Sequence, residues 1–181
     1  MSENRVLGER IIILGCPGSG KGTFARSLHK QTGLPLIHLD NIWWTPDRTT
    51  IPREEFDIRL GEIIKKDRWI LDGDYSRTYE IRFSACDTII FLDFDEEECM
   101  GGITERLGRE SDDIPWTRDE LDPDLVEIVR KYHSVNRPRV LGLIEQYPEK
   151  KVYIFKTRAE ADSWLKNNKH RVRRRCLFSS Y

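Results

Sequence analysis

Residues 10–23 read RIIILGCPGSGKGT, and this stretch decides the fold. Its first part is a short apolar run bounded by a turn, which is typical of a buried strand. Its second part fits the pattern G-x-x-x-x-G-K from Gly15 to Lys21. It is followed by Phe24 and Leu28, whose spacing is that of one face of a helix. A glycine-rich turn between strand and helix presents backbone N–H groups at the positive end of the helix. The stretch therefore predicts a phosphate-binding loop.

Similar apolar runs recur along the chain, each bounded by turn residues and too short for a helix. With the first run they predict five strands, at 10–14, 36–39, 68–71, 88–92 and 151–155. Helical spacing lies between them, as at 56–64 and 125–132. This alternation predicts a parallel sheet covered by helices on both faces, a three-layer α/β fold.

Three helix starts are indicated by capping residues. Asp122 precedes Pro123, and the pairs Asp95/Glu98 and Thr157/Glu160 have the spacing of a capping box.

Composition favours one compact domain, because the chain has 181 residues of which 38% are hydrophobic. The 30 Lys+Arg against 31 Asp+Glu give no overall attraction to nucleic acid or membrane. No run approaches the ~18 apolar residues of a membrane helix, and the N-terminus is polar, so we expect a cytosolic protein. The four cysteines have no metal-ligand spacing and are expected to be free thiols. We assign residues 1–168 to the domain and 169–181 to a basic tail that we interpret as a solvated segment.

The phosphate loop predicts an ATP site. Its binding residues are Gly15, Pro17, Gly18, Ser19, Gly20, Lys21, Gly22 and Thr23, with Lys21 supplying charge for the β- and γ-phosphates. In the common form of this motif, Ser or Thr follows the lysine and ligates Mg²⁺. Here Gly22 stands in that place, so Thr23 is the candidate metal ligand.

The loop resembles that of adenylate kinases and their relatives, G-x-P-G-x-G-K-G-T, at every fixed position. Residues 70–77, ILDGDYSR, are similar to the adenylate kinase segment L-D-G-F-P-R, with one extra residue before the arginine. The resemblance implies that Asp72 holds magnesium-bound water and that Arg77 holds an anionic group of the acceptor. Because the spacing differs, Arg82 is the alternative to Arg77.

Residues 92–109 resemble the segment that enters the adenylate kinase lid, and imply a short lid at about 106–122. Arg106 and Arg109 would then be catalytic clamps, because guanidinium groups stabilise the charge on a transferred phosphoryl group. The alternative is a solvated helical face.

Strand order and length over residues 10–166 look most like the adenylate-kinase-related DNA topology modulation proteins, the FlaR family. That resemblance implies a nucleoside-monophosphate-kinase-like sheet in the order 2-3-1-4-5.

Residues 38–44, HLDNIWW, follow the second strand at the carboxyl edge, where open parallel sheets bind ligands. Asp40 suits an acceptor hydroxyl that must lose a proton, although it could equally cap a turn. Trp43 and its neighbour Trp44 could stack on a base or sugar, or could pack in the core.

These features predict an enzyme that uses ATP and Mg²⁺ to phosphorylate an unidentified small molecule. The alternative is a nucleotide-dependent regulatory protein related to DNA topology, with ATP as a switch and the basic tail as its nucleic-acid contact. We expect no membrane partner and a monomer or weak homodimer. One feature has no explanation from sequence, the pair Gly101 and Gly102 inside an expected helix.

Overall fold

The computed structural model of the protein describes residues 7–173, with side chains up to residue 167. Five strands form one sheet, namely β1 (Arg10–Gly15), β2 (Leu36–His38), β3 (Trp69–Asp72), β4 (Thr88–Leu92) and β5 (Lys151–Phe155). All neighbouring pairs are parallel, and the order is β2-β3-β1-β4-β5. The predicted fold class and strand order are therefore confirmed.

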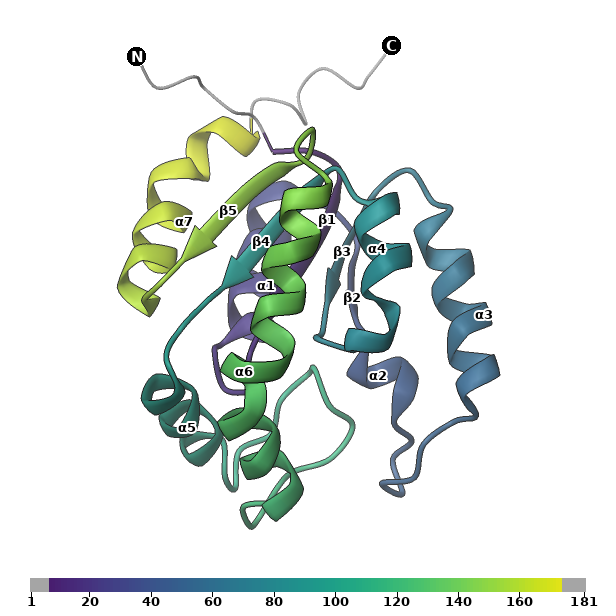
Figure 1. Cartoon of the computed structure of the whole chain (residues 1–181), viewed down its shortest axis with the longest axis vertical. Helices are drawn as coiled ribbons and strands as arrows, with labels where there is room; N and C mark the ends of the chain where they lie inside the picture. The colour runs from purple at the N-terminus through teal and green to yellow at the C-terminus, as the bar shows by residue number, and fades with distance from the viewer. Residues whose placement is uncertain (1–6, 174–181) are drawn as a thin grey trace.

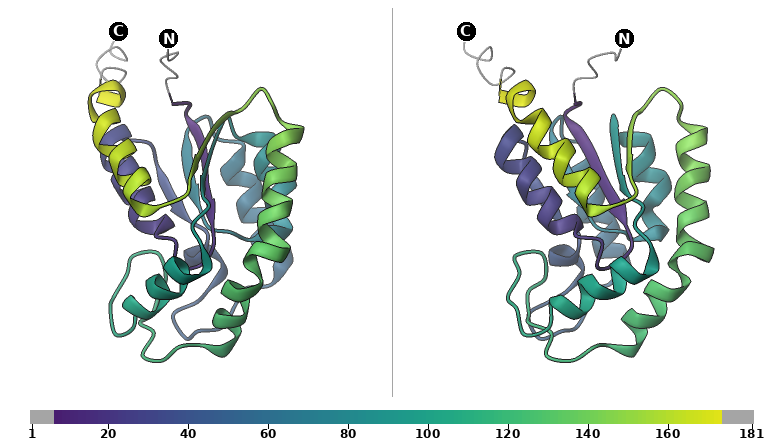
Figure 2. Two further views of the ribbon diagram at one scale, coloured as in Figure 1. Left: turned by 60° about the vertical axis from the view of Figure 1, so that its left-hand side comes forward. Right: turned by 90° about the vertical axis from the view of Figure 1, so that its left-hand side faces the viewer.

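Helices cover both faces of this sheet (Figure 1). They are α1 (Lys21–Thr32), α2 (Asp40–Trp43), α3 (Arg53–Ile64), α4 (Tyr79–Ala85) after the 3-10 turn η1 (Ser76–Thr78), α5 (Glu96–Glu105), α6 (Pro123–Gln146) and α7 (Arg158–Arg173). Figure 2 shows α1 and α7 together on one face and α3, α4 and α6 on the other. None of the helices in residues 7–173 has the length and apolar composition needed to cross a bilayer.

The predicted basic tail begins inside α7, because that helix continues to Arg173. The rest of the tail, residues 174–181, lies outside the described residues.

The predicted helix starts agree with the structure. The Asp95 side chain accepts from the Glu98 N–H at 2.8 Å, and Asp122 accepts from the Asp124 N–H at 2.9 Å with Pro123 as first helical residue. The Thr157 hydroxyl accepts from the Glu160 N–H at 3.2 Å. Each cap satisfies a backbone donor that the first turn of a helix leaves unpaired.

The central strands form the core. Ile11, Ile12, Ile13 and Leu14 of β1 are fully buried, as are Ile89, Ile90 and Phe91 of β4. Such continuous apolar runs are expected for parallel strands with helices on both faces. The carboxyl ends of these strands are therefore supported by a fully buried core.

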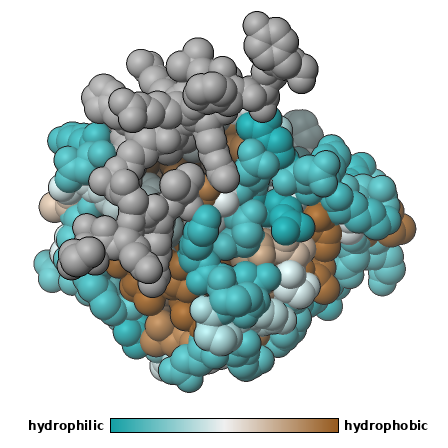
Figure 3. Space-filling model, turned by 90° about the horizontal axis from the view of Figure 1, so that it is seen from above, coloured by the Kyte–Doolittle hydropathy of each residue, from teal (hydrophilic) through white to brown (hydrophobic). Residues whose placement is uncertain are grey.

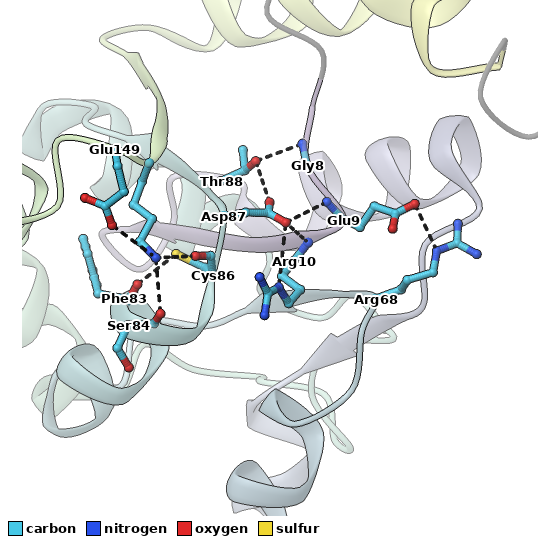
Figure 4. Close-up of polar contacts among 11 residues, drawn as sticks. Gly8, Glu9, Arg10, Arg68, Phe83, Ser84, Cys86, Asp87, Thr88 and Glu149 are labelled. Carbon is cyan, nitrogen blue, oxygen red and sulfur yellow. Dashed lines mark hydrogen bonds and ion pairs between the residues drawn. The ribbon is translucent and has the colours of Figure 1, made fainter.

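Asp87 ties the amino edge of the sheet together, as Figure 4 shows. Its carboxylate accepts from the Glu9 and Arg10 N–H groups at 3.0 and 3.1 Å and from the Thr88 hydroxyl at 2.9 Å. Viewed from this end, the described surface is mostly hydrophilic with patches of hydrophobic residues (Figure 3). The cleft described below lies at the other end of the strands.

Candidate functional site

A cleft of about 1070 Å³ opens at the carboxyl edge of the sheet. Its walls come from the phosphate loop (residues 15–23), α2, the end of β3 and the loop after it, the C-terminal end of α5, the N-terminal half of α6 and residues 106–122. We call residues 106–122 the lid, after the sequence prediction. Ligand pockets in proteins commonly have about 300–1,000 Å³. This cleft is therefore large enough for a nucleotide together with a small second molecule.

The phosphate loop has the backbone shape that its glycines predict. Gly18 and Gly20 both adopt φ of +85°, a conformation that side chains disfavour, and Gly20 directly precedes α1. The Lys21 ammonium donates to the carbonyls of Gly15 and Cys16 at 2.9 and 3.0 Å, which holds it across the loop. The loop thus combines a helix N-terminus with a fixed positive charge, the two features that bind phosphate.

Most of the predicted loop residues face the cleft. Pro17, Gly18, Gly20, Lys21, Gly22 and Thr23 line it. Gly15 and Ser19 lie behind this wall, and the Ser19 hydroxyl is buried with no hydrogen-bond partner among the described residues.

Helix α5 packs directly on the loop and explains one of the two adjacent glycines. A Cβ on Gly102 would lie 2.0 Å from the Gly18 carbonyl oxygen, and a Cβ on Gly18 would lie 2.0 Å from the Cys99 carbonyl oxygen. Both glycines are therefore required for backbone contact between α5 and the loop. Gly101, in contrast, has open space around it.

Several arginines surround the cleft. Arg106 and Arg109, predicted to be phosphate clamps, both line it, and Arg106 donates to Asp113 at 2.7 Å. Arg26 of α1 and Arg158 of α7 line it too, and Arg158 lies beside Gly20, where a Cβ would meet its Nη1 at 2.6 Å. The cleft therefore presents guanidinium groups on both sides of the phosphate loop, an arrangement suited to a polyphosphate.

Asp72 ends β3 beside the cleft and was predicted to belong to the metal site by holding magnesium-bound water. Its Oδ2 pairs with His38 Nδ1 at 2.7 Å, while its Oδ1 is buried without a partner within the described residues. A buried unpaired carboxylate oxygen is costly unless a cation or water meets it. Mg²⁺ prefers carboxylate oxygens and is commonly held by one or two of them together with phosphates, so Asp72 fits this ion. Thr23, the other predicted ligand, is exposed in the cleft and accepts from Arg26 at 3.2 Å.

Asp40 also faces the cleft, at the start of α2. Its Oδ1 accepts a hydrogen bond from the Tyr75 hydroxyl at 2.6 Å, which fixes the carboxylate. Burial raises the pKa of Asp40, the hydrogen bond from Tyr75 opposes this rise, and the charge of Asp72 adds to it. A carboxylate with a raised pKa is a stronger base than an ordinary one.

The paired tryptophans have different environments. Trp43 packs edge-on against Phe56 and Tyr75, with ring centroids 5.5 and 6.2 Å apart, and does not line the cleft. Trp44 does line it and meets Trp116 of the lid edge-on at 4.9 Å. The structure therefore packs a partly buried Trp43 against the core and brings its neighbour Trp44 to the site.

Neither Arg77 nor Arg82 reaches the cleft, although both were candidates for binding the acceptor. Arg77 forms a two-pronged ion pair with Asp57 at 2.7 and 2.8 Å on the surface. Arg82 is fully buried and donates to the carbonyls of Gly73 and Tyr75 at 2.8 and 3.2 Å, and also to that of Asp74. It fixes the loop after β3 because desolvation makes these charge-assisted bonds strong.

Residues of the lid line the cleft and contact the segment after β2. Asn41 donates to the Asp112 carbonyl at 2.6 Å, and Arg48 donates to the Thr117 carbonyl at 3.1 Å. Neither these contacts nor the positions of Asp113 and Arg158 could be predicted from the sequence. The lid has no hydrophobic periodicity, and the only available signal was that Arg158 follows the last strand.

Comparison with known proteins supports the architecture. The chain is 33% identical over 121 residues to the adenylate kinase of Halobacterium salinarum, covering 53% of this chain and 56% of that protein. It thus spans little more than half of that relative's length. No family model matches the chain.

Two solved structures align over most of the chain. A shikimate kinase from Acinetobacter baumannii in complex with shikimate has a TM-score of 0.58 at 16% identity, over 88% of this chain and 90% of that one. A gluconokinase from Sinorhizobium meliloti has a TM-score of 0.56 at 16% identity, over 98% of this chain and 100% of that one. At such identities the likeness establishes the fold, which is that of the P-loop kinases.

Proposed function

We propose that the protein is a phosphotransferase that moves the γ-phosphoryl group of ATP to a hydroxyl group of a small molecule. The phosphate loop, Lys21 and the arginines at both of its sides support the nucleotide half of the proposal. The similarity to an adenylate kinase and the fold shared with two kinases of hydroxy acids support the kinase half.

The position and chemistry of Asp40 decide which class of acceptor we propose. Its carboxylate lies in the cleft with a fixed orientation, and its raised pKa makes it a competent proton acceptor. The two arginines that the resemblance assigned to an anionic acceptor do not line the cleft, because Arg77 pairs with Asp57 and Arg82 is buried. A hydroxyl acceptor is the one that the Asp40 carboxylate suits.

In the proposed reaction the acceptor oxygen bonds to the γ-phosphorus while the bond from that phosphorus to the bridging oxygen of ADP breaks. Asp40 accepts the hydroxyl proton, and the Tyr75 hydroxyl keeps its carboxylate in place. Lys21, Arg106 and Arg109 would balance the charge that spreads over the transferred group. Mg²⁺, for which Asp72 is the proposed ligand with Thr23 nearby, would neutralise charge on the phosphates.

The narrower likeness to the topology modulation proteins stays a prediction, as do the cytosolic location and the monomeric or weakly dimeric state. The regulatory alternative, with ATP as a switch, gains no support from the kinase similarities.

The test is to screen small polyols, hydroxy acids and nucleosides for ATP consumption with detection of phosphorylated product, and then to compare Asp40→Asn with the parent. We expect turnover to fall by about 10²–10⁴-fold, with ATP affinity nearly unchanged. The acid limb of the pH–rate profile should lie above that of an ordinary aspartate and should vanish in the variant, because only the deprotonated carboxylate accepts the proton. Full activity of Asp40→Asn on a hydroxyl acceptor would remove Asp40 from the mechanism.

A further inference from the structure

Gly22 leaves a gap in the phosphate loop that the lid fills. The position directly after the loop lysine commonly carries Ser or Thr, whose hydroxyl binds Mg²⁺. Gly22 is buried, and a Cβ added there would lie 2.5 Å from Oδ2 and 3.1 Å from Cγ of Asp113. A side chain at position 22 and the Asp113 carboxylate therefore exclude each other.

Asp113 is held for this position by its other oxygen. Oδ1 accepts from Arg106 at 2.7 Å and from the Ser111 hydroxyl, whereas Oδ2 faces Gly22. The side chain is 10% exposed, so its carboxylate lies within the cleft. The ion pair with Arg106 therefore engages one oxygen and leaves Oδ2 directed toward Gly22.

A second observation within the same cleft also points to a cation. The side chain of Asp72 is only 6% exposed and lines the cleft, and its Oδ1 oxygen has no partner among the described residues. Asp40 lines the same cleft as Asp72 and Asp113. Carboxylates gathered in a buried cleft repel one another unless positive charge lies between them.

We propose that Asp113 is a metal ligand delivered by the lid, which joins Asp72 around the Mg²⁺ bound with ATP in place of the hydroxyl that Gly22 lacks. This inference rests on the proposed function, since it takes Mg²⁺ and ATP as ligands of the cleft. In this proposal metal binding is coupled to closure of the lid, because the lid residues Asp112 and Thr117, on either side of Asp113, also contact the segment after β2.

The test compares ATP binding with excess Mg²⁺ and with excess EDTA by calorimetry, and follows the lid by tryptophan fluorescence, to which Trp44 and Trp116 contribute. In the parent, Mg²⁺ should strengthen ATP binding and change the fluorescence. Asp113→Asn keeps the shape and removes the charge, and should reduce this Mg²⁺-dependent gain in affinity by about 10–100-fold. Metal-free ATP should bind no more weakly than in the parent, because a negative charge beside the phosphates is removed. Asp112→Asn is the matched control, because that neighbour is exposed and contacts Asn41 through its backbone.

A swap of the two positions sharpens the test. Gly22→Ser alone should impair binding, because its side chain meets Asp113, and Gly22→Ser combined with Asp113→Gly should regain the Mg²⁺ dependence. Unchanged Mg²⁺ dependence in Asp113→Asn, or tighter binding of Mg²⁺ and ATP, would overturn the inference and leave Asp113 as a lid anchor. If the parent bound no ATP under either condition, the proposed function would fail, and this inference with it.

Discussion

Replacing Arg82 by methionine should destabilise the protein far more than the same change at Arg77. Arg82 is fully buried and donates four hydrogen bonds, to the Thr78 hydroxyl and to the carbonyls of Gly73, Asp74 and Tyr75. Hydrogen bonds from a charged donor contribute about 1.5 kcal/mol each, or about 6 kcal/mol together. About half of this is offset, because methionine removes the cost of burying a charge and part of the loop reaches water.

The net loss is then about 3 kcal/mol, which for a protein of this size lowers the melting temperature by about 6–12 °C. Arg77→Met is the control, because its ion pair with Asp57 is exposed and such pairs contribute about 0–1 kcal/mol. Thermal and urea unfolding of both variants measure the difference. Equal losses in the two variants, or an Arg82→Met protein as stable as the parent, would refute the reasoning.

Three further predictions concern the phosphate loop, its contact with α5, and a buried ion pair. Gly102→Ala should lower the free energy of unfolding by about 1–3 kcal/mol and weaken ATP binding, because its Cβ would meet the Gly18 carbonyl oxygen at 2.0 Å. Gly101→Ala should instead raise the free energy of unfolding by about 0.5–1 kcal/mol. Denaturant titration measures both, and equal effects would contradict the packing of α5 on the loop. Lys21→Ala should abolish tight ATP binding in calorimetry with stability within about 0.5 kcal/mol of the parent, and retained binding would count against the loop. Asp93 is buried, which by itself raises its pKa, but bonds from Arg137 and Lys156 hold that pKa below its ordinary value. The stabilisation by the Asp93 carboxylate is therefore present above about pH 4 and is lost as pH falls through the folded pKa. Asp93→Asn should lower the free energy of unfolding by about 1–3 kcal/mol at pH 7 and by little in acid. A loss independent of pH would contradict this.

The sheet and phosphate loop could be predicted because their signals are local. Buried parallel strands read as apolar runs such as Ile11 to Leu14, and glycines 18 and 20 are needed wherever the backbone turns around phosphate. The capping aspartates 95 and 122 likewise act within three residues of themselves.

The partners across the cleft could not be predicted, because they depend on tertiary contacts. The pattern after β3 pointed to Arg77 or Arg82 as an acceptor ligand, but Asp57 on α3 takes one and the loop carbonyls take the other. Asp113 can take its position only because Gly22, far earlier in the chain, has no side chain there. Gly102 likewise has meaning only once α5 packs on the loop.

The most direct test of the central claim is ³¹P NMR of the full-length protein incubated with ATP, Mg²⁺ and one candidate acceptor at a time, with Lys21→Ala as the control. The account predicts that, with a hydroxyl acceptor, the γ-phosphate signal of ATP is replaced in equal amount by that of a phosphate monoester, and that ADP forms alongside. Conversion of a nucleoside monophosphate to its diphosphate, with no monoester from any hydroxyl acceptor, would contradict it, and so would release of inorganic phosphate alone.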